Sequence, residues 1–174
     1  MRTDEELAAA VATGNEAALG ELIARYEHGL GAFLWRQTSG RDSEDLFQET
    51  WLRVVRSADR FDPTRKFSTW LFQIAVNLAR DWHRRRPPEP TAELPEPSHA
   101  GSAARVEAGA DAERLLDRLS TEHREVVVLG YYHDLPNAEV ARILGIPEGT
   151  VKSRMHHALA KLSRIVRDAG GAHG

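Results

Sequence analysis

Residues 137–162, NAEVARILGIPEGTVKSRMHHALAKL, decide how the C-terminal part of this chain folds. Asn137 is expected to cap a first helix with its side-chain oxygen. The apolar residues of that helix recur at helical spacing: Val140, Ile143 and Leu144. Gly145 is expected to end it, because a left-handed backbone conformation costs least at glycine, and Pro147 suits the first turn of a second helix. The stretch predicts a helix-turn-helix.

The second helix of this stretch has one apolar side and one polar side. The apolar stripe consists of Val151, Met155, Ala158, Leu162 and Ile165. The polar residues that lie off the stripe, available to base edges or phosphates, are Lys152, Ser153, His156 and His157. An ordinary helical hairpin with a solvated polar face would show the same pattern. The hairpin alone therefore favours DNA binding only modestly.

The composition limits the classes of protein to which the chain can belong. The 174 residues include no cysteine, which excludes disulfides, thiol catalysis and cysteine-ligated zinc. No apolar run is long enough to cross a membrane, and the Thr3-to-Glu6 capping pattern differs from a secretion signal, so we expect a cytoplasmic protein. The formal net charge of −3 is unusual for a protein that holds DNA by itself. Either basic groups are concentrated locally or DNA binding depends on another protein.

Residues 87–110 are expected to form a flexible linker between two domains. This segment contains five of the eight prolines together with many small residues, and it has no apolar periodicity. An extended proline-rich tether of this size could span up to roughly 70 Å, enough to reach two separate DNA sites, although a passive spacer would have the same composition. The predicted domains are residues 1–86 and 111–170.

Both predicted domains are helical, and strands are hard to find. Asn15 is expected to cap a long helix, Asp42 or Ser43 to begin the next, and Ser68 to begin a third that runs until Pro87. Two further amphipathic segments, 112–119 and 122–131, precede the hairpin. The predicted fold class is therefore all-α, with two small helical domains of which the second ends in a helix-turn-helix.

One predicted helix of the first domain has an acidic polar face. Its residues are Glu44, Asp45, Gln48, Glu49 and Arg53. Such a face is most often a solvated surface. In a DNA-binding protein, however, carboxylates repel phosphate, which makes a protein partner plausible.

The next predicted helix carries amide and guanidinium side chains on one strip. Its residues are Gln73, Asn77, Arg80, Asp81 and Arg84. This combination suits hydrogen bonds to bases flanked by phosphate contacts. The preceding segment 61–68 places Arg65, Lys66 and Phe67 side by side. A plain loop is the default interpretation, and a pocket for a base drawn out of the duplex is the alternative.

Three separated motifs, in order and at their usual spacing, resemble those of the extracytoplasmic-function (ECF) group of bacterial sigma factors. The motifs are DSEDLFQETWLRVVR, FSTWLFQIAVNLARDWHRRR and LSTEHREVVVLGYYHDLPNAEVARILGIPEGTVKSRMHHALAKL. The resemblance implies a transcription initiation factor that binds core RNA polymerase, directs it to promoter DNA and helps to open the duplex. It also implies a protein that is not an enzyme and needs no cofactor or metal, with an anti-sigma factor as a further partner.

The resemblance assigns residues to three surfaces. It implies a polymerase-binding surface of Asp45, Leu46, Gln48, Glu49, Leu52 and Arg53. The minus-10 surface that it implies consists of Arg65, Lys66, Phe67, Ser68, Gln73, Asn77, Arg80, Asp81, Arg84 and Arg85. Minus-35 contacts are implied for Lys152, Ser153, His156 and His157. Members commonly carry arginine where His157 and Leu159 stand, and neutral histidine would weaken the electrostatic contact with DNA.

Two other functions fit parts of the sequence. A stand-alone helix-turn-helix regulator, dimeric and with a sensing N-terminal half, leaves the acidic and amide-rich strips unexplained. A magnesium-dependent nucleic-acid hydrolase would need the carboxylates Asp42, Glu44, Asp45 and Glu49, which lie on consecutive turns of one helix without a basic catalytic group. Metal binding by His156 and His157 is less favoured than DNA contact, because adjacent helical residues diverge by about 100°.

Overall fold

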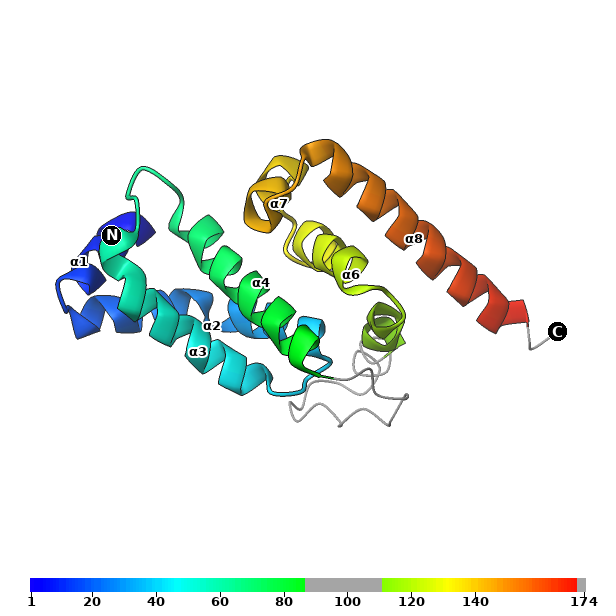
Figure 1. The fold of residues 1–174 in the computed structure, drawn as a ribbon, viewed down its shortest axis with the longest axis horizontal. Coiled ribbons are helices and arrows are strands. Elements are labelled where there is room, and N and C mark those ends of the chain that lie inside the picture. Colours follow the sequence, from blue (N-terminus) through cyan, green and yellow to red (C-terminus); the bar gives the residue numbers. More distant parts are fainter. Residues whose placement is uncertain (87–110, 172–174) are drawn as a thin grey trace. The chain divides into compact units, whose positions relative to one another are not determined.

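The computed structural model describes residues 1–86 and 111–171, which form two compact helical units (Figure 1). None of the described residues belongs to a strand, so the predicted all-α class is confirmed. In this part of the chain no helix combines the length and apolarity that a membrane span requires. The predicted linker, 87–110, lies outside the described residues.

The first unit begins with two helices whose caps are encoded locally. In α1 (Asp4–Ala12), Thr3 and Glu6 form the predicted capping box, each side chain accepting a backbone N–H of the other residue. In α2 (Glu16–Thr38), the Asn15 side-chain oxygen accepts the N–H of Ala18 at 3.0 Å, as predicted. The two helices pack against each other.

The turn after α2 depends on left-handed backbone at several residues. Gly40 has φ +77°, and a Cβ atom there would lie 2.7 Å from the indole of Trp35. Ser39 and Asp42 also have positive φ, and Asp42 directly precedes α3 (Ser43–Ser57), where its side chain makes no capping bond. The chain then continues through the short 3-10 helix η1 (Ala58–Arg60) into α4 (Phe67–Arg85).

An aromatic cluster forms part of the core of this unit. Phe33 of α2 meets Phe72 of α4 edge to face, with ring centres 5.4 Å apart. The fully buried ring of Phe67 lies 5.6 Å from Tyr26 and 5.8 Å from Phe61. Because Phe67 is the first residue of α4, this cluster fixes where that helix begins.

The second unit begins with two helical segments, and buried valines form part of its core. Residues 111–117 are helical, and Ser120 caps α6 (Thr121–Val127) by accepting the N–H of His123. A π-helical turn, η2 (Val128–Tyr132), continues α6. The buried apolar residues of this part of the unit are Leu116, Leu119, Val126, Val127, Val128 and Leu129.

The helix-turn-helix consists of α7 (Asn137–Leu144) and α8 (Glu148–Gly171). Gly145 ends α7 as predicted, with φ +67° and its N–H donated to the carbonyl of Ala141. The prediction that Asn137 caps α7 was wrong: Asn137 is the first helical residue, and Pro136 occupies the cap position without a side-chain bond. Pro147 precedes α8, and its carbonyl accepts the N–H groups of Thr150 and Val151.

Candidate nucleic-acid interface

The outward side of α3 combines carboxylates with apolar side chains. Asp45 and Gln48 are exposed, and Glu49 pairs with Arg53 at 3.2 Å one helical turn away. Leu52 is 48% exposed and Val55 is 46% exposed, although the helix buries Trp51 and Val54 on its other side. Exposed apolar groups next to charges are typical of surfaces that contact another protein.

One residue expected on this polymerase-binding surface is not at the surface. The side chain of Leu46 is 9% exposed and points into the core. Its carbonyl accepts a hydrogen bond from the buried Thr50 hydroxyl at 2.7 Å. Leu46 therefore supports α3 from the core rather than offering a contact.

The polar strip predicted on α4 lies on the side of the helix opposite its buried residues. Asn77, Arg84 and Arg85 are exposed, whereas Gln73, Arg80 and Asp81 are half-buried. The buried side contains Leu71, Phe72, Ala75, Val76, Leu78 and Ala79. Asp81 forms an ion pair with Arg84 one turn later, which restricts the guanidinium to one region of the surface.

The loop before α4 is held in a turn by the side chain of Asp62. Asp62 Oδ1 accepts the backbone N–H of Thr64 at 2.9 Å and the Thr64 hydroxyl at 2.7 Å. These bonds, with the nearby charge of Arg65, keep the pKa of Asp62 below its ordinary value. Arg65 and Lys66 are exposed, so the turn presents two cations to solvent.

The expectation that Phe67 contacts an extruded base is contradicted by its burial. The ring is fully buried in the aromatic cluster of the core and cannot reach a base without local unfolding. Ser68 follows it in the first turn of α4 and is half-buried. The exposed part of the predicted loop therefore ends at Lys66.

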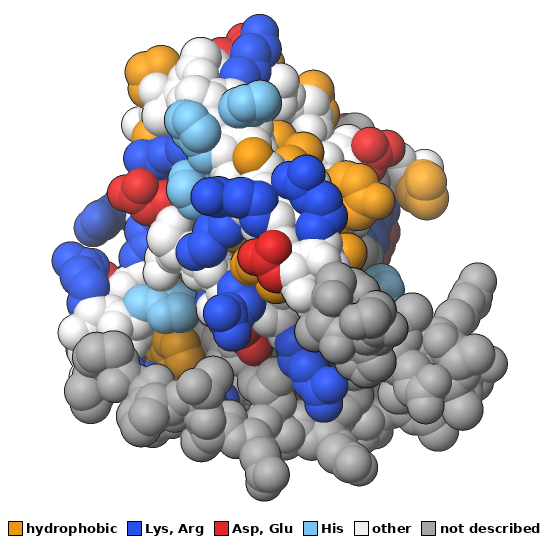
Figure 2. All heavy atoms as spheres, turned by 90° about the vertical axis from the view of Figure 1, so that its right-hand side faces the viewer, with side chains coloured by type: hydrophobic (Ala, Val, Ile, Leu, Met, Phe, Trp, Pro, Cys, Tyr) orange, Lys and Arg blue, Asp and Glu red, His pale blue; other side chains and the backbone are white. Residues whose placement is uncertain are grey.

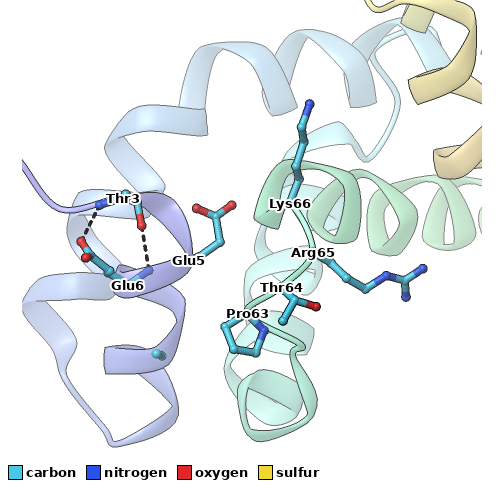
Figure 3. Close-up of a pocket in the computed structure, with 8 residues that line it drawn as sticks. Thr3, Glu5, Glu6, Pro63, Thr64, Arg65 and Lys66 are labelled. Atoms are coloured by element: carbon cyan, nitrogen blue, oxygen red, sulfur yellow. Dashed lines mark hydrogen bonds between the residues drawn. The ribbon is translucent and has the colours of Figure 1, made fainter.

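An open hollow of about 610 Å³ separates this loop from α1 (Figure 3). Its lining residues are Thr3, Glu5, Glu6, Ala9, Pro63, Thr64, Arg65 and Lys66. Glu5 extends from α1 toward the loop, and its Oε1 accepts the backbone N–H of Phe67 at 3.0 Å. Residues of α1 therefore line one wall of the hollow and residues of the loop line the other, while the Arg65 side chain extends away from α1 (Figure 3).

The polar side of α8 is exposed at every predicted DNA-contact residue: Lys152, Ser153, His156 and His157. Lys152 pairs loosely with Glu148 at 3.4 Å. Figure 2 shows a face of the molecule on which histidine side chains gather beside lysine and arginine side chains. The stripe on the other side of α8 follows the prediction, with Val151 and Ala158 fully buried.

His123 of α6 joins the histidines of α8. Its ring centre lies 6.5 Å from that of His157, which in turn lies 5.8 Å from that of His156. Partial burial lowers the pKa of His123, and electrostatic repulsion from His157, Lys161 and Arg154 lowers it further. Within residues 1–86 and 111–171, no group of three histidine, aspartate or glutamate side chains is arranged to hold a metal ion.

Sequence reasoning missed the residues that hold these surfaces in place. Asp62 was recognisable, because an Asp-Pro-Thr sequence is typical of a side-chain-bonded turn. Glu5 had no such signal, because its bond joins residues 62 positions apart. His123 was likewise unremarkable as a sequence residue, and only the packing of α6 on α8 brings it to His157.

Comparison with known families places both units. The model described as sigma-70 region 2 matches residues 22–87, and the model described as sigma-70, region 4 matches residues 110–162. The chain is 38% identical over 168 residues to the ECF RNA polymerase sigma factor SigM of Mycobacterium tuberculosis, covering 95% of this chain and 85% of the relative. It is 34% identical to the RNA polymerase sigma factor CnrH of Cupriavidus metallidurans, covering 94% of each chain.

Solved structures agree with this relationship. The structure of CnrH in complex with the cytosolic domain of CnrY matches with a TM-score of 0.76 and 34% identity, covering 95% of this chain and 97% of that one. The sigma factor RpoE of Bartonella quintana, solved with the anti-sigma factor NepR, matches with a TM-score of 0.71 over 85% of this chain. At 22% identity, the second match concerns the fold alone.

Proposed function

The chain belongs to the extracytoplasmic-function group of bacterial RNA polymerase sigma factors, and on that premise we propose how its parts share promoter recognition. It is a transcription initiation factor that directs RNA polymerase to promoters. Residues 1–86 form the domain that docks on core polymerase and reads and melts the minus-10 element. Residues 111–170 form the domain that reads the minus-35 element, and residues 87–110 link the two.

Core polymerase docks on the outward side of α3. The proposed contacts are Asp45, Gln48, Glu49, Leu52 and Arg53. The 48% exposure of Leu52 supports this assignment, because burying an apolar side chain against a partner stabilises a complex. The charged side chains of the same surface would orient the polymerase as it docks. Leu46 belongs to the core beneath this surface and is not one of the contacts.

The minus-10 element is read by the exposed strip of α4 and by the loop before it. Asn77 offers an amide to a base edge, while Arg84 and Arg85 follow at the basic end of the helix and suit phosphates. The pair between Asp81 and Arg84 orients the guanidinium rather than opposing DNA. The remaining residues proposed at this element are Arg65, Lys66, Ser68, Gln73 and Arg80.

The minus-35 element is read by α8 in the major groove. Lys152 and Ser153 lie in its first turns, and His156 and His157 follow on the same exposed side. Histidine donates a hydrogen bond when neutral but adds little charge near neutral pH. The minus-35 contact therefore relies on hydrogen bonds and surface fit more than on electrostatic attraction to phosphate. Leu159, which is uncharged, does not add to that attraction.

The protein acts through polymerase and contributes no catalytic step of its own. The net charge of −3 makes the free chain a poor ligand for duplex DNA, because phosphate neutralisation supplies most non-specific affinity. We place it in the cytoplasm with its polymerase. A further partner is an anti-sigma factor, and the relative CnrH, which was solved bound to the cytosolic domain of CnrY, supports a protein ligand for this fold.

One observation carries the docking assignment: Leu52 is 48% exposed, one turn after Glu49, on the helix that lies within the region 2 match. The test uses purified full-length chain and core RNA polymerase. We expect Asp45→Lys to weaken core binding at least about tenfold, because it reverses a charge in the proposed interface. Glu27→Lys, the same charge change at an exposed position of α2, is the control and is expected to bind as wild type.

Transcription assays with start-site mapping test the function itself. Wild-type chain added to core polymerase is expected to start transcripts at discrete promoters, whereas the isolated chain binds the same duplexes weakly. Tight, sequence-specific binding of duplex promoters by the isolated chain would favour a stand-alone regulator instead. Equal core affinity for Asp45→Lys and Glu27→Lys would place polymerase docking elsewhere.

A further inference from the structure

The first turn of α4 is capped by a residue from α1 rather than by its own neighbour. Lys66 occupies the cap position of α4 and makes no side-chain capping bond. The carboxylate of Glu5 accepts the N–H of Phe67 instead, at 3.0 Å. A carboxylate at a helix N-terminus is favourable both as an acceptor and against the helix dipole. α1 therefore supplies the capping acceptor that the loop sequence does not provide.

A second connection runs in parallel from the adjacent acid. The Tyr26 hydroxyl of α2 donates to Asp4 of α1 and is also hydrogen-bonded to Ser68 of α4. Arg25 holds Asp4 from the other side at 2.6 Å. Burial and the Asp4 charge raise the pKa of Tyr26, so the hydroxyl stays protonated and remains a donor. Two consecutive acids of α1 are thus connected to the first two residues of α4, Glu5 directly to Phe67 and Asp4 through Tyr26 to Ser68.

The loop between these anchors is short and fixed at both ends. Phe61 and Phe67 are buried on either side of it, and Asp62 closes the turn from within. Arg65 and Lys66 remain exposed. Their position therefore depends on where the first turn of α4 is held.

We propose that Glu5, supported by Asp4 through Tyr26, is a positioning residue that preorganises the promoter-reading loop of residues 62–66. The inference rests on the proposed minus-10 role of Arg65 and Lys66. Glu5 is not itself a DNA contact, because a carboxylate repels phosphate. Its contribution is to remove loop freedom before DNA arrives, which lowers the entropy lost when strands separate and bases are captured.

The test compares Glu5→Ala, Glu5→Gln and Glu6→Gln in the full-length chain. Glu5→Gln keeps an acceptor for the Phe67 N–H, so it is expected to retain most of the wild-type behaviour that Glu5→Ala loses. Glu6 lines the same hollow, and its replacement removes the same charge while leaving the cap on α4 in place. Glu6→Gln therefore controls for the field near the loop, because its amide oxygen can still accept the Thr3 N–H and keep the first turn of α1 capped.

Two measurements are needed. Amide hydrogen exchange of Phe67 is expected to accelerate about fivefold in Glu5→Ala and much less in the other two variants. With core polymerase, Glu5→Ala is expected to form open complexes on a duplex promoter about fivefold more slowly, with unchanged core affinity. On a promoter already unpaired at the minus-10 element, the deficit is expected to shrink.

The outcomes separate the inference from the proposed function. Wild-type rates of promoter opening in Glu5→Ala, with accelerated exchange at Phe67, would overturn the positioning role. An equal loss in Glu6→Gln would overturn it as well, because the effect would then follow the charge near the loop rather than the cap on α4. Failure of the wild-type chain to direct initiation would instead overturn the proposed function, while the exchange result would still report on the cap.

Discussion

The indole N–H of Trp82, in the last turns of α4, donates a 2.9 Å hydrogen bond to the carboxylate of Asp42, the residue before α3. Asp42 also pairs with Arg86, whose guanidinium lies 4.6 Å from the centre of the Trp82 ring. Asp42, which directly precedes α3, thus holds the C-terminal end of α4. The basic end of α4 is attached in this way to the turn between α2 and α3.

Replacing Asp42 by alanine is expected to lower the free energy of unfolding of the first unit by about 1 to 2 kcal/mol. Alanine loses the acceptor for Trp82, and at φ +50° it also adopts left-handed backbone unfavourably. The pair with Arg86 is partly exposed and adds little. Asp42→Asn keeps an acceptor and tolerates this conformation, so denaturation followed by tryptophan fluorescence should show a much smaller loss.

Gly40→Ala is expected to destabilise the same unit by about 2 to 4 kcal/mol. The backbone is left-handed there, and the new methyl group would overlap the ring of Trp35, which must then move. Gly20→Ala is the matched control, because that helical glycine has open space around it and should gain about 0.5 to 1 kcal/mol. Equal denaturation midpoints for the two variants would contradict the packing described for Trp35.

Arg124 of α6 is buried, and its replacement by alanine should destabilise the second unit by about 2 to 4 kcal/mol. Its Nε donates to the carbonyl of Leu116 at 3.1 Å, which attaches α6 to the preceding segment. Burial lowers the pKa of Arg124, and nearby Asp117 opposes that shift.

The measurement exploits the position of the tryptophans, all four of which precede the linker. Circular dichroism should show early melting of helix in Arg124→Ala, while tryptophan fluorescence follows the first unit. Arg118→Ala, an exposed neighbour, should change stability by less than about 0.5 kcal/mol. A large loss of stability in Arg118→Ala would indicate that helix propensity or charge, rather than the buried hydrogen bond of Arg124, causes the destabilisation.

Acidification should weaken the second unit through His123. Its folded-state pKa lies below the ordinary value of 6.5, so the folded state binds fewer protons than the unfolded state just below that pH. The stability that depends on neutral His123 is therefore fully present above about pH 6.5 and is lost as pH falls from that value through the lower folded-state pKa. His123→Gln should flatten the dependence of melting temperature on pH between about 7.5 and 5, and an unchanged slope would contradict this origin.

Local signals in the sequence predicted most helix boundaries, but they missed how α4 and α7 are capped. The capping box at Thr3, the cap at Asn15 and the stop at Gly145 each involve residues within one turn, so they could be recognised without a structure. The start of α4 was predicted at Ser68, one residue late, and its cap could not be predicted because the acceptor comes from Glu5 across the fold. Phe67 was consequently assigned to a loop and a site, although it belongs to the core.

Periodicity was more reliable for surfaces than for individual contacts. The exposed strip of α4 and the two sides of α8 follow from a 3.6-residue repeat. Leu46 shows the limit of the family resemblance instead: the resemblance assigned it to the polymerase-binding surface, whereas Asp45 and Gln48 are exposed and Leu46 faces inward, as its helical spacing indicates. The contact between His123 and His157 depends on tertiary packing and has no counterpart in local sequence.

The bond between Glu5 and Phe67 also has a consequence for biosynthesis. Because it joins positions 62 residues apart, we expect it to close late, after the intervening helices have packed together. A nascent chain still lacking α4 has no amide for Glu5 to meet. The loop should therefore acquire its final shape only when translation has passed the whole first unit, so that premature fragments emerge without a working promoter-opening apparatus.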